Sequence, residues 1–244
     1  GLDFDYDFRM DVTMAGAGGV RLYRQTSQST FDDETAMAIP AAARNRPYVG
    51  VWTADLDMEG DLDLVLAPPT DAPVVLRNNG DGTFSEVGRE AGINAPPRWS
   101  SAAVFFDADR DGHLDLYVGN YVRWSPETDL FCSLDGVTKG YCTPEQYEGA
   151  DGRFYHNNGD GTFSDWTERA GFLPTPGKTL GAAMLDFNKD GWIDLAVAND
   201  MERDLLYVNN GDGTFTERGV ASGIAYSEDG VARAGMGIDA GGGD

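Results

Sequence analysis

The feature that most constrains this chain is an acidic motif that returns at nearly regular intervals. The copy D107-A-D-R-D-G-H-L-D is matched position for position by D186-F-N-K-D-G-W-I-D. Further copies begin at Asp55 and, more weakly, at Asp3, and a fragment begins at Asp239. Successive starts are 52, 52, 79 and 53 residues apart. Repetition at this period predicts blades or solenoid coils, because each unit is a small supersecondary structure that packs mainly on its neighbours.

Each repeat carries the signals of four short strands. In the second repeat the ranges 49–54, 62–67, 74–77 and 83–87 are rich in β-branched or aromatic residues and are separated by turn-forming residues. No long stretch shows a convincing helical period, so we expect few helices. The chain is predicted to be all-β, a β-propeller of four-stranded antiparallel blades with the acidic loops between strands 1 and 2. A β-sandwich would not explain the near-identical units.

The repeats predict a single domain over residues 1–244, with units starting near residues 3, 55, 107, 186 and 239. Propellers usually close with more blades than four units and a fragment supply, so we expect part of a larger ring of about seven blades. The long interval after Asp107 predicts an insertion over about residues 121–152. The sequence N-N-G-D-G-T-F, which starts at Asn78, Asn157 and Asn209, predicts hairpin turns that need positive φ.

The acidic loops have the pattern of an oxygen-only calcium site. Positions 1, 3, 5 and 9 offer side-chain oxygens, position 7 offers its backbone carbonyl, and position 6 is Gly60, Gly112 or Gly191 in three copies. Zinc would require His or Cys, and an EF-hand would require a bidentate Glu at position 12, which is apolar here. We therefore expect Ca²⁺ at three loops and leave the first loop open, because Phe8 replaces its glycine.

The predicted metal ligands follow from this numbering, with the position-7 residues acting through their carbonyls. They are Asp107, Asp109, Asp111, His113 and Asp115 in the third loop; Asp186, Asn188, Asp190, Trp192 and Asp194 in the fourth; Asp55, Asp57, Glu59, Asp61 and Asp63 in the second; and Asp3, Asp5, Asp7, Arg9 and Asp11 in the first.

The insertion is the other candidate site. It carries five aromatic residues that we expect to form a partner-binding surface or, alternatively, a small satellite core: Tyr121, Trp124, Phe131, Tyr141 and Tyr147. As a connection between strands 2 and 3 it should project from the face opposite the acidic loops. Cys132 and Cys142 are expected to form a local disulfide, with two free thiols as the alternative.

Charge limits the partners. The formal net charge of -23 disfavours binding to nucleic acid or to an anionic membrane, because both are bound mainly through Lys and Arg. No apolar run is long enough to span a membrane, so direct membrane insertion is not expected. A protein or glycan partner is expected instead.

These motifs resemble the FG-GAP or VCBS-type repeats of integrin-like calcium-binding β-propellers. The D-x-D-x-D-G-x-x-D-L loops, the N-N-G-D-G-T-F turns, the A-G-[IF] endings and the C132-x9-C142-T-P segment are similar to those of the bacterial cartilage acidic protein 1-like family. That resemblance implies a secreted or periplasmic propeller, often followed by an ASPIC/UnbV domain, with calcium held by the residues given above.

The leading functional prediction is a non-catalytic binding or scaffold module in which calcium rigidifies the loops. A calcium-dependent polysaccharide lyase or hydrolase is the main alternative, and a structural subunit of an envelope assembly is another. Catalysis requires a positioned acid and base beyond the metal ligands. The two histidines have simpler explanations, His113 as the position-7 residue and His156 as a neighbour of the hairpin, so no catalytic residue is predicted.

Overall fold

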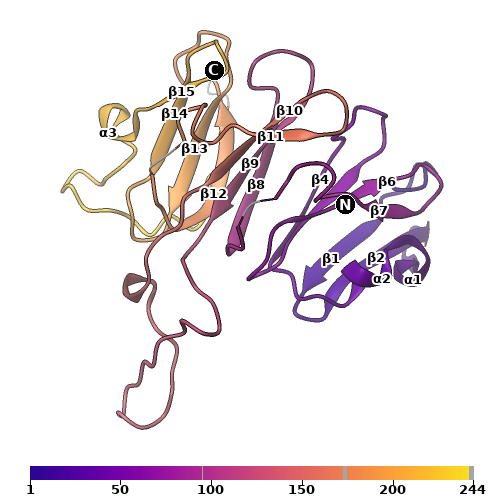
Figure 1. Ribbon diagram of the computed structural model, residues 1–244, viewed down its shortest axis with the longest axis horizontal. Coiled ribbons are helices and arrows are strands. Elements are labelled where there is room, and N and C mark those ends of the chain that lie inside the picture. The colour runs from indigo at the N-terminus through magenta and orange to yellow at the C-terminus, as the bar shows by residue number, and fades with distance from the viewer. Residues whose placement is uncertain (95, 173–174, 242–244) are drawn as a thin grey trace.

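The computed structural model describes residues 1–94, 96–172 and 175–241 and contains four antiparallel sheets (Figure 1). Their strands are β1 (Val12–Gly16), β2 (Gly19–Ser27) and β3 (Thr30–Asp33); β4 (Gly50–Ala54), β5 (Asp63–Ala67), β6 (Val74–Asn78) and β7 (Phe84–Glu86); β8 (Ser100–Phe106), β9 (Asp115–Asn120), β10 (Arg153–Asn157) and β11 (Phe163–Asp165); and β12 (Thr179–Leu185), β13 (Asp194–Asn199), β14 (Leu205–Asn209) and β15 (Phe215–Glu217). Each sheet pairs its strands in sequence order, which confirms an all-β fold of propeller-type blades.

The first sheet departs from the expected four strands. It has three, because the segment before the first acidic loop pairs only through a single bridge between Leu2 and Asp11. The beginning of a further repeat at Asp239 forms no strand over residues 239–241, and Gly243 and Asp244 lie outside the described residues. The described chain thus contains three complete blades and one three-stranded blade.

Helices are few among the described residues, as expected. They are α1 (Thr35–Ala38), α2 (Ala41–Arg44), the 3₁₀ turn η1 (Pro144–Gln146) and α3 (Gly219–Ser222). In the described part of the chain, no helix has the length and apolar character needed to cross a membrane.

The hydrophobic core lies between successive sheets and explains why the second strand of each complete blade is buried throughout. In β9, Leu116 and Val118 join the cluster shared with the second blade, whereas Tyr117 joins the cluster shared with the fourth. Strand alternation therefore sends neighbouring side chains into two different blade interfaces. Burying each such large side chain contributes about 1.5–3 kcal/mol, so the interfaces between blades stabilise the fold.

The topology places the two repeated turns at one edge of each blade. The acidic loop of the third repeat joins β8 to β9 where Phe106 pairs with Asp115, and the N-N-G-D-G-T-F turn joins β10 to β11 where Asn157 pairs with Phe163. The insertion leaves β9 from its opposite end, after Asn120, and extends away from the sheets as a long projection (Figure 1). The predicted placement on opposite faces is confirmed.

Candidate metal loops and insert pocket

In all four acidic loops the position-6 N–H donates to the first carboxylate, and in all but the second loop the position-5 N–H does so as well. In the third loop, Asp107 accepts the N–H of Asp111 at 3.1 Å and that of Gly112 at 3.0 Å. In the fourth, Asp186 accepts the equivalent N–H groups of Asp190 and Gly191 at 3.1 and 2.9 Å. The shape of each loop is therefore fixed by hydrogen bonds between its backbone and its own position-1 carboxylate.

Two backbone positions in each loop have positive φ, and the sequence indicated only one of them. Position 6 was expected, and its φ is 92° at Gly112. Position 4 is also left-handed although it is never glycine, with φ of 64° at Arg110 and 58° at Tyr6. Phe8 adopts a φ of 63° at position 6 of the first loop and still donates its N–H to Asp3 at 2.9 Å. The first loop thus keeps the common shape at a backbone cost of about 1–2 kcal/mol.

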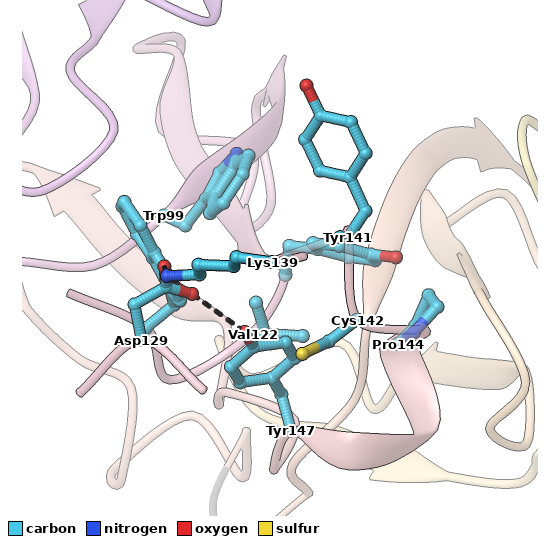
Figure 2. A pocket seen from close by; sticks show the side chains of 11 residues that line it. Trp99, Val122, Asp129, Lys139, Tyr141, Cys142, Pro144 and Tyr147 are labelled. Atoms are coloured by element: carbon cyan, nitrogen blue, oxygen red, sulfur yellow. Dashed lines mark hydrogen bonds and ion pairs between the residues drawn. The ribbon is translucent and has the colours of Figure 1, made fainter. Parts of the chain in front are cut away.

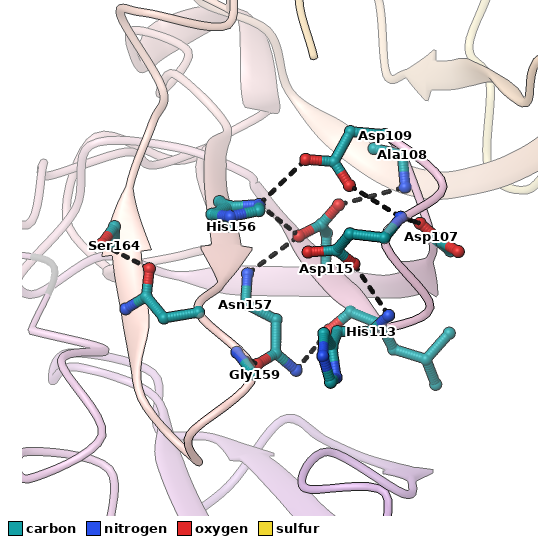
Figure 3. A network of polar contacts seen from close by, with 12 residues as sticks. Asp107, Ala108, Asp109, His113, Asp115, His156, Asn157, Gly159 and Ser164 are labelled. Atoms are coloured by element: carbon teal, nitrogen blue, oxygen red, sulfur yellow. Dashed lines mark hydrogen bonds and ion pairs between the residues drawn. The ribbon is translucent and has the colours of Figure 1, made fainter.

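The position-9 carboxylates are buried structural acceptors as well as predicted ligands. Asp115 accepts the N–H of Ala108 at 3.0 Å and the N–H of Asn157 at 2.8 Å, so it ties the loop to strand β10 (Figure 3). Burial raises the pKa of Asp115 to about 6 and that of Asp63 to about 7. A buried carboxylate with these neighbours is stabilised in its charged form by a cation.

The geometry of the donor atoms fits a hard cation at the second loop. One oxygen of each of Asp55, Asp57 and Asp63 lies within 4.8 Å of the others. Asp55 Oδ1 is buried without a hydrogen-bond partner among the described residues, which leaves it free to bind a cation. Glu59 is exposed and lies outside this converging set, and Asp61 is half-buried beside Gly80. Three of the five predicted ligands of the second loop therefore lie close enough together to bind one cation.

The other loops bring together different subsets. Asp3, Asp5 and Asp11 converge in the first, and Asp107, Asp109 and Asp111 in the third. In the fourth loop, Asn188 donates its side-chain N–H to Asp190 at 2.7 Å, and Asp194 is buried with its pKa raised by burial.

The residue immediately before Gln25, Asn78, Asn157 or Asn209 has the same place in each repeat, and it is Arg in the first two repeats, His in the third and Val in the fourth. In the first repeat it is Arg24, whose Nε lies 2.8 Å from Asp5 Oδ2 and 3.9 Å from Asp7 Oδ2. Arg9 adds a second contact to Asp7 at 3.0 Å. Protein cations already neutralise part of this loop, a feature that the nine-residue motif alone does not reveal.

His156 occupies the corresponding position of the third repeat. Its Nδ1 lies 3.1 Å from Asp115 Oδ1 and 3.6 Å from Asp109 Oδ2, and its ring stacks on Trp166 at 3.8 Å (Figure 3). The expectation that His156 merely flanks the hairpin was incomplete, because β10 delivers its imidazole onto the acidic loop.

The position-7 side chains pack on the neighbouring hairpin turns. A Cβ at Gly159 would lie 2.6 Å from His113 Nε2, and one at Gly211 would lie 2.9 Å from Trp192 Nε1. Both glycines also have positive φ, of 75° and 77°. The first glycine of each of these N-N-G turns is therefore required both by its backbone conformation and by a ring above it.

The first Asn of each N-N-G-D-G-T-F turn links successive blades. Asn157 donates its side-chain N–H to the carbonyl of Leu56 at 2.8 Å, and Asn209 donates to the carbonyl of Ala108 at 2.7 Å. Leu56 and Ala108 occupy position 2 of the preceding acidic loops. The sequence predicted only a turn here, whereas the structure shows a turn that also fastens one metal loop to the next blade.

The A-G-[IF] endings make a second link. The carbonyl of Ala91 accepts the N–H of Phe163 at 2.7 Å, and the carbonyl of Ala170 accepts that of Phe215 at 2.8 Å. A Cβ at Gly92 would lie 2.3 Å from the Phe163 carbonyl oxygen. The glycine is needed because the two backbones approach so closely.

The insertion forms an aromatic cavity of about 580 Å³ where it meets the third blade (Figure 2). Cys132 and Cys142 form the expected disulfide, with their Cα atoms 5.2 Å apart. Tyr121, Trp124, Tyr141 and Tyr147, all predicted as partner-binding residues, line the cavity together with Trp99, Val122, Asp129, Lys139, Gly140, Cys142 and Pro144. Phe131 is exposed and does not line it.

A polar network forms part of the lining of this cavity. Asp129 Oδ1 accepts hydrogen bonds from Trp124 Nε1 and from the Tyr147 hydroxyl, each at 3.0 Å. Lys139 forms a close ion pair with Asp129 Oδ2. These partners, Lys139 first, hold the pKa of Asp129 at about 2. Sequence reasoning missed Asp129, Lys139 and Trp99, since they stand out only once the chain has folded.

Comparison with known families decides the classification. The model of the FG-GAP-like repeat matches residues 3–66, 55–118, 129–197 and 186–241, which together span most of the chain. The chain belongs to the FG-GAP-like repeat family. Each matched FG-GAP-like segment runs from one acidic loop into the next, except that the third begins within the insertion.

One curated protein and one solved structure are similar to this chain. Human cartilage acidic protein 1 is 23% identical over 258 residues, which cover 81% of this chain and 38% of that protein. A solved structure concerning recognition of non-reducing terminal N-acetylglucosamine by an Agrocybe aegerita lectin shares 19% identity, with a TM-score of 0.45, over 88% of this chain and 49% of the lectin chain. The FG-GAP-like chain thus spans less than half of the length of each.

Proposed function

We propose that this protein is a calcium-binding, non-catalytic recognition module that acts outside the cytoplasm. The observation that carries the proposal is the set of acidic loops with one common fold, in all of which the position-9 carboxylate is buried and in three of which it lies within 4.8 Å of at least one other carboxylate. Such clusters are unfavourable without a neutralising cation. All-oxygen donors on irregular loops suit Ca²⁺ better than Mg²⁺, which demands near-ideal octahedral geometry.

The residues of the second loop indicate what a bound cation would do. At the second loop, Asp55, Asp57 and Asp63 would hold it, and the unpartnered Asp55 Oδ1 provides an oxygen with no competing hydrogen bond among the described residues. Bound calcium supplies positive charge that stabilises the folded loop. Because Asn157 ties the carbonyl of Leu56 to the third blade, a rigid loop also stabilises the junction between blades.

We assign three calcium sites, at the loops that begin at Asp55, Asp107 and Asp186. We assign no calcium site to the first loop, because Arg24 and Arg9 already pair with Asp5 and Asp7. A guanidinium this close repels a divalent cation.

Recognition is assigned to the insertion rather than to the metal loops. The insertion lies at the opposite end of β9 from the acidic loop. Its aromatic cavity is lined in part by Cys142, which forms a disulfide with Cys132. Disulfides persist in oxidising compartments, which supports a secreted, periplasmic or cell-surface location. Rigid aromatic residues are the typical anchors of binding sites, so a protein or glycan partner is favoured.

Isothermal titration calorimetry of chelator-treated protein tests the calcium assignment. We expect about three Ca²⁺ per chain and much weaker heats with Mg²⁺. Asp190→Ala should remove one equivalent, whereas Asp81→Ala, which alters an exposed hairpin carboxylate beside the first loop, should remove none. Absence of calcium binding, or equal binding of both cations, would contradict the proposal.

A further inference from the structure

The insert cavity has an unusual wall for a surface loop, because several rings meet at fixed angles. Trp99 contacts Trp124 edge-to-face with ring centroids 5.5 Å apart and contacts Tyr121 in the same manner at 6.0 Å. The Tyr121 hydroxyl donates to Asp200 at 2.7 Å, which anchors this ring to the fourth blade. Edge-to-face packing leaves the rings in different orientations, so the wall can offer ring faces as well as edges to a ligand.

Its polar groups are held in position before any ligand arrives. Trp124 and Tyr147 both donate to Asp129, so their ring orientations are coupled through one carboxylate. Figure 2 shows the Lys139 side chain reaching across the cavity to the same carboxylate. Preorganisation of this kind reduces the entropy lost on binding.

The charges of the cavity select among ligand classes. Asp129 and Lys139 neutralise each other, so neither an anion nor a cation gains a net attraction there. A purely apolar or Pro-rich ligand would cover the ion pair without replacing its hydrogen bonds to water, which is costly. The ligand that matches aromatic faces beside an exposed ion pair with no net charge is a ring with apolar C–H faces and hydroxyl groups.

We propose that this cavity binds a neutral pyranose ring of a glycan. The inference rests on the proposed function and names the ligand class of its recognition site. Trp124 and Tyr147 present the aromatic surface, Asp129 accepts hydrogen bonds from ligand hydroxyls, and the Lys139 ammonium, which has three N–H donors, donates to ligand oxygens. Tyr141 stands at the rim, where its ring is fully exposed and points away from Tyr147 (Figure 2).

The direct test is titration of the calcium-loaded protein with neutral hexasaccharides of glucose, mannose, galactose or N-acetylglucosamine, followed by tryptophan fluorescence and calorimetry. We expect saturable binding of at least one of them. Trp124→Ala should weaken it about 30-fold, equivalent to about 2 kcal/mol. Trp124→Phe keeps a ring and should lose less, and Phe131→Ala is the matched control because Phe131 is an exposed aromatic of the insertion outside the cavity.

A change of specificity provides a second readout. Lys139→Met keeps an unbranched chain but leaves Asp129 without its counter-ion. This variant should bind the hexasaccharide at least 5-fold more weakly and should gain binding of choline, because a carboxylate flanked by aromatic rings attracts a quaternary ammonium. The two opposite changes in one variant cannot arise from general unfolding.

Other probes decide against the inference. If no neutral hexasaccharide binds, if Phe131→Ala loses as much as Trp124→Ala, or if a polyproline peptide, oligogalacturonate or choline binds the native protein more tightly, the pyranose assignment is wrong. Calcium titration of the same samples separates the two proposals. Intact calcium binding without sugar binding overturns only the inference, whereas absent calcium binding overturns the calcium module itself.

Discussion

Replacing Asn209 by Ala tests whether the N-N-G-D-G-T-F elements fasten blades together. The Asn209 side chain is buried and donates to the carbonyls of Ala108 at 2.7 Å and Ile193 at 3.2 Å, and it accepts the N–H of Gly211 at 2.9 Å. Truncation removes three hydrogen bonds and leaves polar backbone groups unpaired at a blade junction. At about 1 kcal/mol for each bond, the free energy of unfolding should fall by about 3 kcal/mol. For a chain of this size that lowers Tm by about 6–12 °C.

The adjacent Asn210 is the matched control. It is exposed, and its side chain bonds to the hydroxyls of Thr214 at 2.9 Å and Thr216 at 3.0 Å within the same hairpin. Water can replace these partners, so Asn210→Ala should lower the free energy of unfolding by only about 0.5 kcal/mol.

Urea unfolding followed by circular dichroism, in saturating calcium, gives both values. Asn157→Ala and Asn158→Ala repeat the comparison independently, since Asn157 bridges to Leu56 at 2.8 Å and Asn158 bonds to the hydroxyl of Thr162 at 2.9 Å. Equal losses within each pair would refute the reasoning, because they would show that the buried Asn acts only as a turn residue.

The remaining predictions concern the acidic loops. Chelation with EDTA should lower Tm, and Ca²⁺ should restore it far better than Mg²⁺; identical melting curves would contradict a structural role for the cation. Asp190→Ala should reduce calcium stoichiometry and stability more than Asp5→Ala, because Asp5 already pairs with Arg24 at 2.8 Å, and equal losses measured by calorimetry would show that the arginine does not replace the cation. In EDTA, stability should fall as pH rises from about 4 to 7, since burial raises the pKa of Asp63 to about 7 and of Asp115 to about 6, so that the folded state binds more protons than the unfolded state over that range. Calcium should flatten this dependence in melting curves recorded across the range, and a chelated protein that gains stability over the same interval would contradict the sign.

The sequence by itself determined the features that depend on neighbours along the chain. The 52-residue spacing predicts repeated blades, and short segments rich in β-branched or aromatic residues between turn-forming residues predict their strands. The acidic loops are equally local, since Asp107 bonds to Asp111 and Gly112, only four and five residues away. Even Phe8 follows the common loop shape despite the missing glycine.

Tertiary structure decided the features whose partners come from another blade or from distant parts of the chain. Asn209 and Ala108 are 101 residues apart, so the link between blades has no signature within one repeat. Arg24 reaches the first acidic loop from β2, and His156 reaches the third from β10. The first loop is therefore partly neutralised by arginine, whereas the third has an imidazole neighbour. The insert cavity exists because Trp99 precedes β8 while Trp124 follows β9, and antiparallel pairing of those strands brings the two rings together. Local hydrogen bonds are encoded by spacing, whereas these contacts depend on how the sheets stack and where each strand ends.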